Sequence, residues 1–223
     1  MKNTLFILIL SCISLIAKAQ TDAYYKAMLK ASSSLQEANN PEAFTSAYNH
    51  FSRIAQANSK DWAAKYHATF ALFMSGYSNT GSDMERAQKL IDEAQISLYE
   101  LEQISSDNNQ KSEVAVLQAY IHIGKLIENT MANGQSMTPL VFSSLGKAEM
   151  LNPQNPRAAF IKGVFTLNMP AFIGGGVEAA LPILKKASSL FDQEVAEGFH
   201  PRWGKEDNRD LLNSLMSKKD SED

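Results

Sequence analysis

Three stretches of the chain align without a gap: WAAKYHATFAL (residues 62–72), EVAVLQAYIHI (113–123) and RAAFIKGVFTL (157–167). Each stretch holds two small residues four positions apart, as in Ala64 and Ala68. Small residues at this spacing lie on one face of a helix and allow a neighbouring helix to approach closely. The alignment therefore predicts a helix that is repeated along the chain. A fainter copy runs through Ala23, Tyr25, Ala27, Leu29 and Ala31.

A second segment follows each of these helices, with apolar or small residues at positions 0, +4 and +7, which share one helical face. Breaks rich in asparagine, aspartate and proline separate the segments, and one of them contains a typical helix start, Asn155 followed by Pro156. The pattern predicts a stack of helical hairpins. The four triplets are Ala47/Phe51/Ile54, Ala87/Ile91/Ala94, Val141/Leu145/Ala148 and Ala180/Leu184/Ala187.

The composition agrees with an all-α class. The 223 residues include 27 alanines but only 6 valines, and glycine and proline together are too scarce for a turn-rich β-sandwich or barrel. With 44% hydrophobic and 20% charged residues, the chain is typical of a globular protein. Its formal net charge of −3 provides no basic surface, so we expect no nucleic-acid partner.

The N-terminus predicts a secretory signal at residues 1–19. Lys2 precedes an apolar run from Leu5 to Ile16 that is too short to span a bilayer, and Ala17-Lys18-Ala19 has the small-x-small pattern of a cleavage site. We therefore expect an exported protein, periplasmic or extracellular, without a membrane span. The lone cysteine, Cys12, would leave with the signal; the alternative is a lipoprotein signal in which Cys12 is lipidated.

The hairpins resemble tetratricopeptide repeats (TPRs). Residues 147–158 (KAEMLNPQNPRA) look like the end-and-restart segment of that repeat, with Ala148 and Pro153 five positions apart. Successive repeats begin 41, 51 and 44 residues apart, instead of about 34 in the family, so the helices or the loops must be longer. The resemblance implies a right-handed α-solenoid of about four TPR-like hairpins over residues 20–217, followed by a polar tail at 218–223.

Two further segments are similar to elements of exported bacterial repeat proteins of the Bacteroidetes type. Residues 169–180 (MPAFIGGGVEAA) resemble their Pro-x-x-Phe-Gly-Gly-Gly insertion, and residues 200–206 (HPRWGKE) resemble the Pro-x-Trp-Gly element after their last repeat. We expect Trp203 and a C-terminal helix from Lys205 to Met216 to cap the stack, because an uncapped terminal repeat would expose its apolar face.

The resemblance implies a binding function. In a TPR array the first helix of each hairpin forms an inner wall, so one hypothesis is an interaction scaffold that holds a protein or peptide partner in this groove. The alternative is an accessory subunit, for example of a solute transporter, that encloses a small molecule between the wall and the glycine-rich loop. The wall residues could equally be packed core. The candidate groove residues are Trp62, Lys65, Thr69, Glu113, Tyr120, Arg157 and Phe160, with Leu72, Val116, Ile123, Val164 and Leu167 beside them, and the candidate loop contacts are Phe172, Gly174, Gly175 and Gly176.

No sequence pattern indicates catalysis. The glycines at 174–176 could hold an anion, but no Lys-Ser/Thr pair follows them, so the phosphate-loop signature is absent. Of the four histidines only His200 has an acid three or four residues away, Glu197, and Gly198 and Pro201 disfavour a continuous helix there. We therefore expect a protein that is not an enzyme, with no catalytic residues, no metal site and no cofactor.

Overall fold

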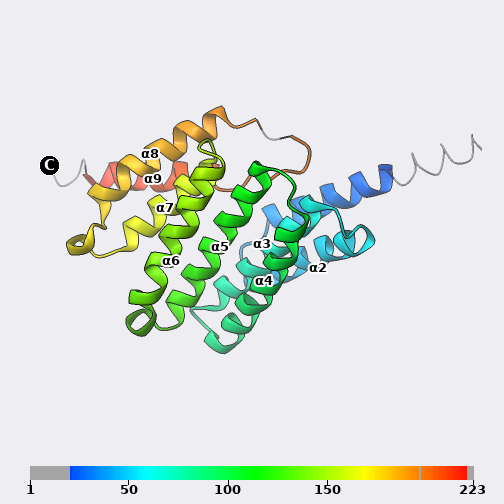
Figure 1. The fold of residues 1–223 in the computed structure, drawn as a ribbon, viewed down its shortest axis with the longest axis horizontal. Helices are drawn as coiled ribbons and strands as arrows, with labels where there is room; N and C mark the ends of the chain where they lie inside the picture. The colour runs from blue at the N-terminus through cyan, green and yellow to red at the C-terminus, as the bar shows by residue number, and fades with distance from the viewer. Residues whose placement is uncertain (1–20, 196, 220–223) are drawn as a thin grey trace, which may run out of the picture.

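The computed structural model describes residues 21–195 and 197–219, so the expected signal with Cys12 and the last four residues of the polar tail lie outside the described part. Within that part the chain forms helices and no strand, which confirms the all-α class (Figure 1). A first helix occupies residues 21–36. It is followed by α2 (Pro41–Ala57), α3 (Trp62–Asn79), α4 (Met84–Ile104), α5 (Asn108–Glu128), α6 (Thr130–Leu151), α7 (Pro156–Asn168), the short 3₁₀-helix η1 (Ala171–Ile173), α8 (Val177–Gln193) and α9 (Lys205–Lys219).

Side-chain caps explain where the helices begin. Asn155, for example, accepts hydrogen bonds from the backbone N–H groups of Arg157 and Ala158, and Pro156 occupies the first helical position, where no N–H is needed. The same kind of cap opens five other helices. The capping residues are Asn40, Asp61, Asp83, Asp107, Asn129 and Asn155.

Successive helices pack as antiparallel hairpins (Figure 1).

The long spacing between successive repeats in the sequence has two causes. Helices α5 and α6 contain 21 and 22 residues and are joined through Asn129 alone, so this pair is long because its helices are long. Helices α7 and α8 are shorter, with 13 and 17 residues, and an inserted loop that contains η1 joins them.

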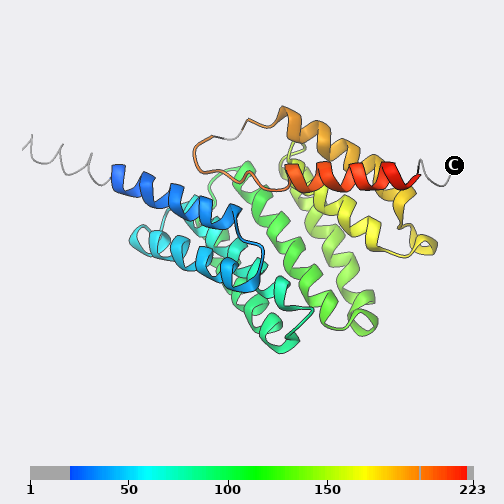
Figure 2. The same ribbon diagram turned by 180° about the vertical axis from the view of Figure 1, so that it is seen from behind.

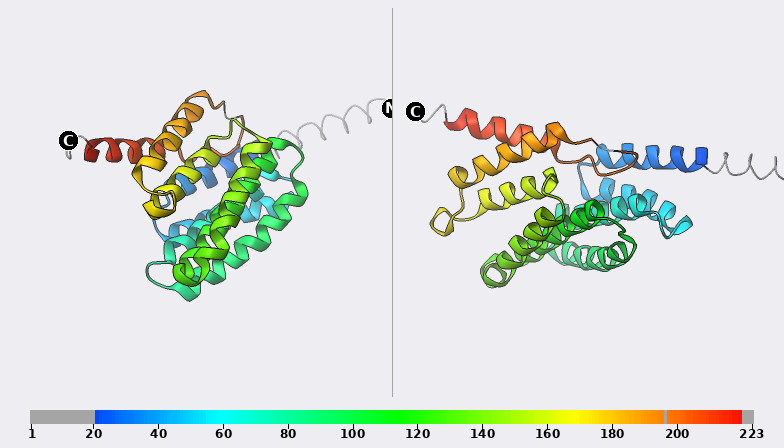
Figure 3. Two further views of the ribbon diagram at one scale, coloured as in Figure 1. Left: turned by 60° about the vertical axis from the view of Figure 1, so that its left-hand side comes forward. Right: turned by 45° about the horizontal axis from the view of Figure 1, so that its top comes forward.

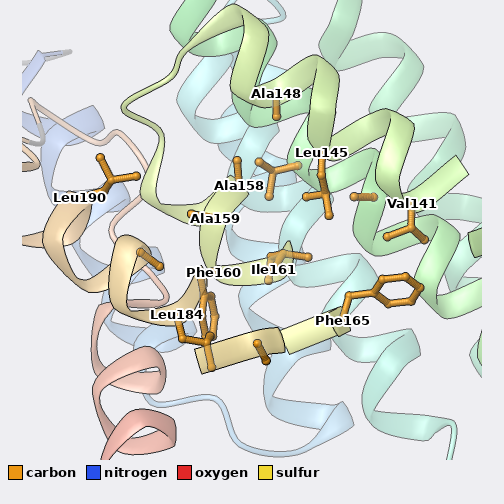
Figure 4. Packing of buried hydrophobic residues seen from close by; sticks show 14 of the residues in the cluster. Val141, Leu145, Ala148, Ala158, Ala159, Phe160, Ile161, Phe165, Leu184 and Leu190 are labelled. Atoms are coloured by element: carbon orange, nitrogen blue, oxygen red, sulfur yellow. The ribbon is translucent and has the colours of Figure 1, made fainter. Parts of the chain in front are cut away.

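The triplets of the second helices lie in the core. All of their residues are fully buried except Ile54, which is half-buried. Figure 4 shows how Val141 and Leu145 of α6 face Ile161 and Phe165 of α7. Close helix approach also explains one small residue, because a Cβ atom at Gly163 would lie 2.6 Å from Cδ2 of Leu184 on α8.

Helix α9 packs on α8, at the place where the sequence predicts a capping helix. Leu212 is buried and Leu211 and Leu215 are half-buried against the core, while the side-chain amide of Asn208 donates to the carbonyl of Leu184 at 3.3 Å. The helix continues to residue 219, so the first two residues of the expected polar tail are helical. None of the helices in the described residues is long and apolar enough to cross a membrane.

Candidate functional site

The connection between α8 and α9 (residues 194–204, of which 196 is not described) crosses the N-terminal halves of α3, α5 and α7 (Figure 2). Aromatic side chains attach it there. Phe199 meets Tyr24 edge to face at 6.1 Å, and Trp203 stacks on Phe70 with ring centroids 4.8 Å apart. We call the side of α3, α5 and α7 on which this connection lies the inner face.

A buried polar network lies beneath the connection. The Trp203 indole N–H donates to the Tyr66 hydroxyl, which donates to Oε2 of Glu113, both at 3.0 Å. Arg157 donates from Nε to Oε1 of Glu113 at 2.9 Å and pairs in bidentate fashion with Glu194. The side chain of Arg157 is only 4% exposed and that of Glu113 8%. Buried charges of this kind are stable only when paired, and here each has a partner.

The electrostatics fix the protonation of this network. Burial acts to lower the pKa of Arg157, but the Glu113 and Glu194 carboxylates raise it overall, so the guanidinium stays charged. Burial and the Glu113 carboxylate raise the pKa of Tyr66 well above its ordinary value. Tyr66 therefore keeps its proton and remains the donor to Glu113.

His67 forms a second attachment point. One ring nitrogen, Nε2, lies 2.9 Å from the Phe199 carbonyl, and the ring stacks on Phe51 at 4.9 Å. Nδ1 is buried without a hydrogen-bond partner among the described residues. Burial lowers the pKa of His67 to about 4, although the Phe199 carbonyl acts in the opposite direction. The imidazole is thus neutral at pH 7 and donates from Nε2.

A cavity of about 430 Å³ adjoins the network, between the start of α5, the start of α7 and the end of α8. Its size is that of a small-molecule site. The lining is mostly polar, and the buried charges are already paired with one another. Among the lining residues are Glu113, Arg157, Glu194, Asn109, Gln154 and His200.

Apolar side chains extend the inner face beyond the connection. Tyr120 and Ile123 on α5, and Val164 and Leu167 on α7, pack against the core but are only half-buried. We call these four residues the apolar wall. Tyr120 also lies 5.5 Å from the Trp203 ring, so the wall begins where the α8–α9 connection ends.

Several candidate groove residues lie under the connection. Trp62 is 6% exposed, stacks on Tyr66 and lies 5.7 Å from His200, while its N–H donates to Ser105. Glu113 and Arg157 belong to the buried network, and Phe160 is 6% exposed in the core. For these residues the chain itself fills the groove, so the packed-core alternative describes them better than an open groove.

Two candidates face another helix. Lys65 pairs with Glu100, and the Thr69 hydroxyl lies 2.7 Å from the Ser97 hydroxyl, so both contact α4 and not the inner face. Leu72 and Val116 are buried. The residues that do form the inner face of α3 had a recognisable signal in the sequence, namely aromatic residues at spacings of 4 and 3. They are Tyr66, Phe70 and Phe73.

The loop candidates lie at the other end of α7. Phe172 is 89% exposed, and Gly174 and Gly176 have φ values of 89° and 87°, which favour glycine. Gly175 is buried against the backbone of Met169. The structure therefore brings the loop next to the end of the apolar wall, but not to Trp62 or Arg157.

No group of three or more His, Cys, Asp or Glu side chains within the described residues is arranged to hold a metal ion. His122 lies between two polar neighbours, with Gln118 at 3.1 Å and Ser144 at 3.3 Å. His200 lies against Trp62 at the cavity. Both histidine rings are therefore in contact with neighbouring side chains.

Comparison with known proteins gives one informative match. No family model and no curated protein matches the sequence. Among solved structures the chain is similar to the HusA haemophore from Porphyromonas gingivalis, with a TM-score of 0.73 and 27% sequence identity, over 89% of this chain and 93% of that chain. The match supports a helical protein of the Bacteroidetes type and is not specific to tetratricopeptide repeats.

Proposed function

We propose that the protein is an exported carrier that binds a small, flat, largely apolar ligand of the haem class. The observation that carries this proposal is the likeness to a haemophore along almost the whole length of both chains. It favours the ligand-binding alternative over the protein scaffold, because the groove that a scaffold would use is filled by the α8–α9 connection. Transport of a ligand also implies binding without catalysis.

The apolar wall is the surface that suits such a ligand. Tyr120, Ile123, Val164 and Leu167 are half-buried, so they are held in place by the core and still offer accessible apolar surface. Binding sites for small apolar molecules combine aliphatic and aromatic side chains in this way. The polar cavity beside Arg157 suits a porphyrin ring less well, because a ring bound there would remove water from the paired charges that line the cavity.

A haem titration of the chain from Gln20 onward tests the proposal. We expect a saturable change in the haem absorbance spectrum with one ligand per chain. Ile123→Ser or Leu167→Ser removes apolar contact area and is expected to weaken binding about tenfold. The matched control is Ile96→Ser, because Ile96 is 61% exposed on α4, away from the wall. Absence of saturable binding by the wild-type protein would refute the proposal. Equal affinities for all three variants would refute the placement of the ligand on the apolar wall.

A further inference from the structure

The loop between α7 and α8 displays apolar side chains to solvent. Phe172 is 89% exposed, Ile173 53% and Val177 43%. Single exposed apolar residues are common on soluble proteins, but contiguous groups often mark an interaction site. The function proposed for the apolar wall does not use these three residues.

The loop that presents Phe172 is held in one shape. The backbone N–H groups of Gly174, Gly175 and Gly176 each donate to a carbonyl of the loop or of the end of α7, at 3.0–3.1 Å. A Cβ atom at position 175 would lie 2.2 Å from the Met169 carbonyl oxygen, so only glycine fits there. A preformed loop loses little conformational entropy on binding, which favours recognition by Phe172.

The hydrogen bond from Asn208 to the Leu184 carbonyl joins the first turn of α9 to the middle of α8, and the two helices diverge towards the start of α8 (Figure 3). We define the apolar tip as Phe172, Ile173 and Val177.

The size of the tip argues against a second copy of this chain as its occupant. Three partly exposed side chains offer roughly 300 Å², since a full aromatic side chain contributes about 150–250 Å². A stable dimer commonly buries about 800 Å² per partner. The tip therefore fits a weaker, transient contact.

The charge around the tip argues against an anionic lipid surface. Glu178 follows Val177 in the first turn of α8, and residues 169–180 contain no lysine or arginine. A membrane-binding loop gains much of its affinity from basic side chains. We propose that the apolar tip docks transiently on a protein partner that offers an apolar pocket for Phe172, bordered by a basic side chain for Glu178.

Site-specific photocrosslinking identifies this partner. A benzophenone amino acid replaces Phe172 in the full chain, and cells that naturally export the protein are irradiated. The matched control carries the same group in place of Tyr99, an aromatic residue 58% exposed on α4. We expect a single protein, other than a second copy of this chain, to be crosslinked from position 172 and not from position 99.

The crosslinked protein is then purified and titrated. We expect Phe172→Ser to weaken its binding about tenfold or more, as at an interface hot spot, and Tyr99→Ser to bind like the wild type. Ile173→Ser provides a second variant, and circular dichroism verifies folding. The proposal is overturned if position 172 crosslinks only to a second copy or to nothing, or if Phe172→Ser binds the partner as tightly as wild type. It is equally overturned if Phe172 instead drives binding to phosphatidylglycerol vesicles. None of these results depends on haem binding.

Discussion

The indole ring of Trp203 lies nearly parallel to the ring of Phe70, with an interplanar angle of 8° and centroids 4.8 Å apart. This contact joins the α8–α9 connection to α3. The same indole donates to the Tyr66 hydroxyl, and the Arg157 guanidinium lies 5.8 Å from its ring centroid, within the range of a cation–π interaction. Trp203 is therefore the residue at which the aromatic and ionic contacts of the inner face meet.

Replacement of Trp203 separates these contributions. Trp203→Phe retains a ring for stacking but removes the donor to Tyr66, so we expect a loss of about 1 kcal/mol of unfolding free energy. Trp203→Ala also removes the packed ring, and we expect a loss of about 3 kcal/mol of unfolding free energy. Urea denaturation measures both. Equal losses for Trp203→Ala and Tyr99→Ala, a truncation at an exposed site, would contradict this account.

Arg157→Met leaves the Glu113 carboxylate buried without its charged partner. Removal of one member of a buried pair typically costs about 3–5 kcal/mol, and we expect a loss of that size in chemical denaturation. The double variant with Glu113→Leu is expected to recover part of it, because no unpaired charge remains at that position. Lys147→Met is the control: its pair with Glu102 is exposed, so we expect a change below about 1 kcal/mol.

Two glycine-to-alanine variants are expected to change stability in opposite directions. A Cβ atom at Gly163 would overlap with the fully buried Leu184, so Gly163→Ala should destabilise the fold by about 1–3 kcal/mol. Gly146 lies inside α6, and no atom of the described residues lies within 4 Å of its Cβ position, so Gly146→Ala should stabilise the fold by about 0.5–1 kcal/mol. Thermal unfolding of both proteins tests this, and a shift of the same sign in both would contradict it.

His67 makes stability depend on pH. Its pKa is about 4 in the folded protein and about 6.5 in the unfolded chain, so the unfolded state binds the proton more readily between these values. Its contribution is present in full above pH 6.5 and is lost as the pH falls towards 4, by up to about 3 kcal/mol. Denaturation at pH 7, 5.5 and 4.5 measures this dependence. As the pH falls, His67→Gln should lose less unfolding free energy than the wild type. His50→Gln, altered at a partly exposed site, should behave like the wild type.

The hairpins could be predicted from the sequence because their signal is local. The small residues Ala64 and Ala68, and the triplet Val141, Leu145 and Ala148, mark the buried faces of individual helices, and the structure buries all five. Such patterns depend only on the period of the helix. They require no knowledge of which distant segments meet.

The site could be predicted only in part because it depends on long-range contacts. The positions expected from the repeat family were displaced on α3, where Lys65 and Thr69 contact α4 and Tyr66 takes the inward place. In the sequence alone, Arg157 fits the pattern of a groove residue. In the folded chain it is paired with Glu113 and Glu194 and is buried. No local period in the sequence indicates that these two carboxylates converge on one guanidinium.

The α8–α9 connection alters how the fold is expected to lose its structure. In a simple repeat array each unit contacts only its neighbours, so the ends fray independently and unfolding proceeds along the array. Here Phe199, near the end of the chain, contacts Tyr24 in the first helix and His67 in α3. Because these contacts link the first helix to the connection before α9, we expect the first and last hairpins to unfold together in one cooperative transition.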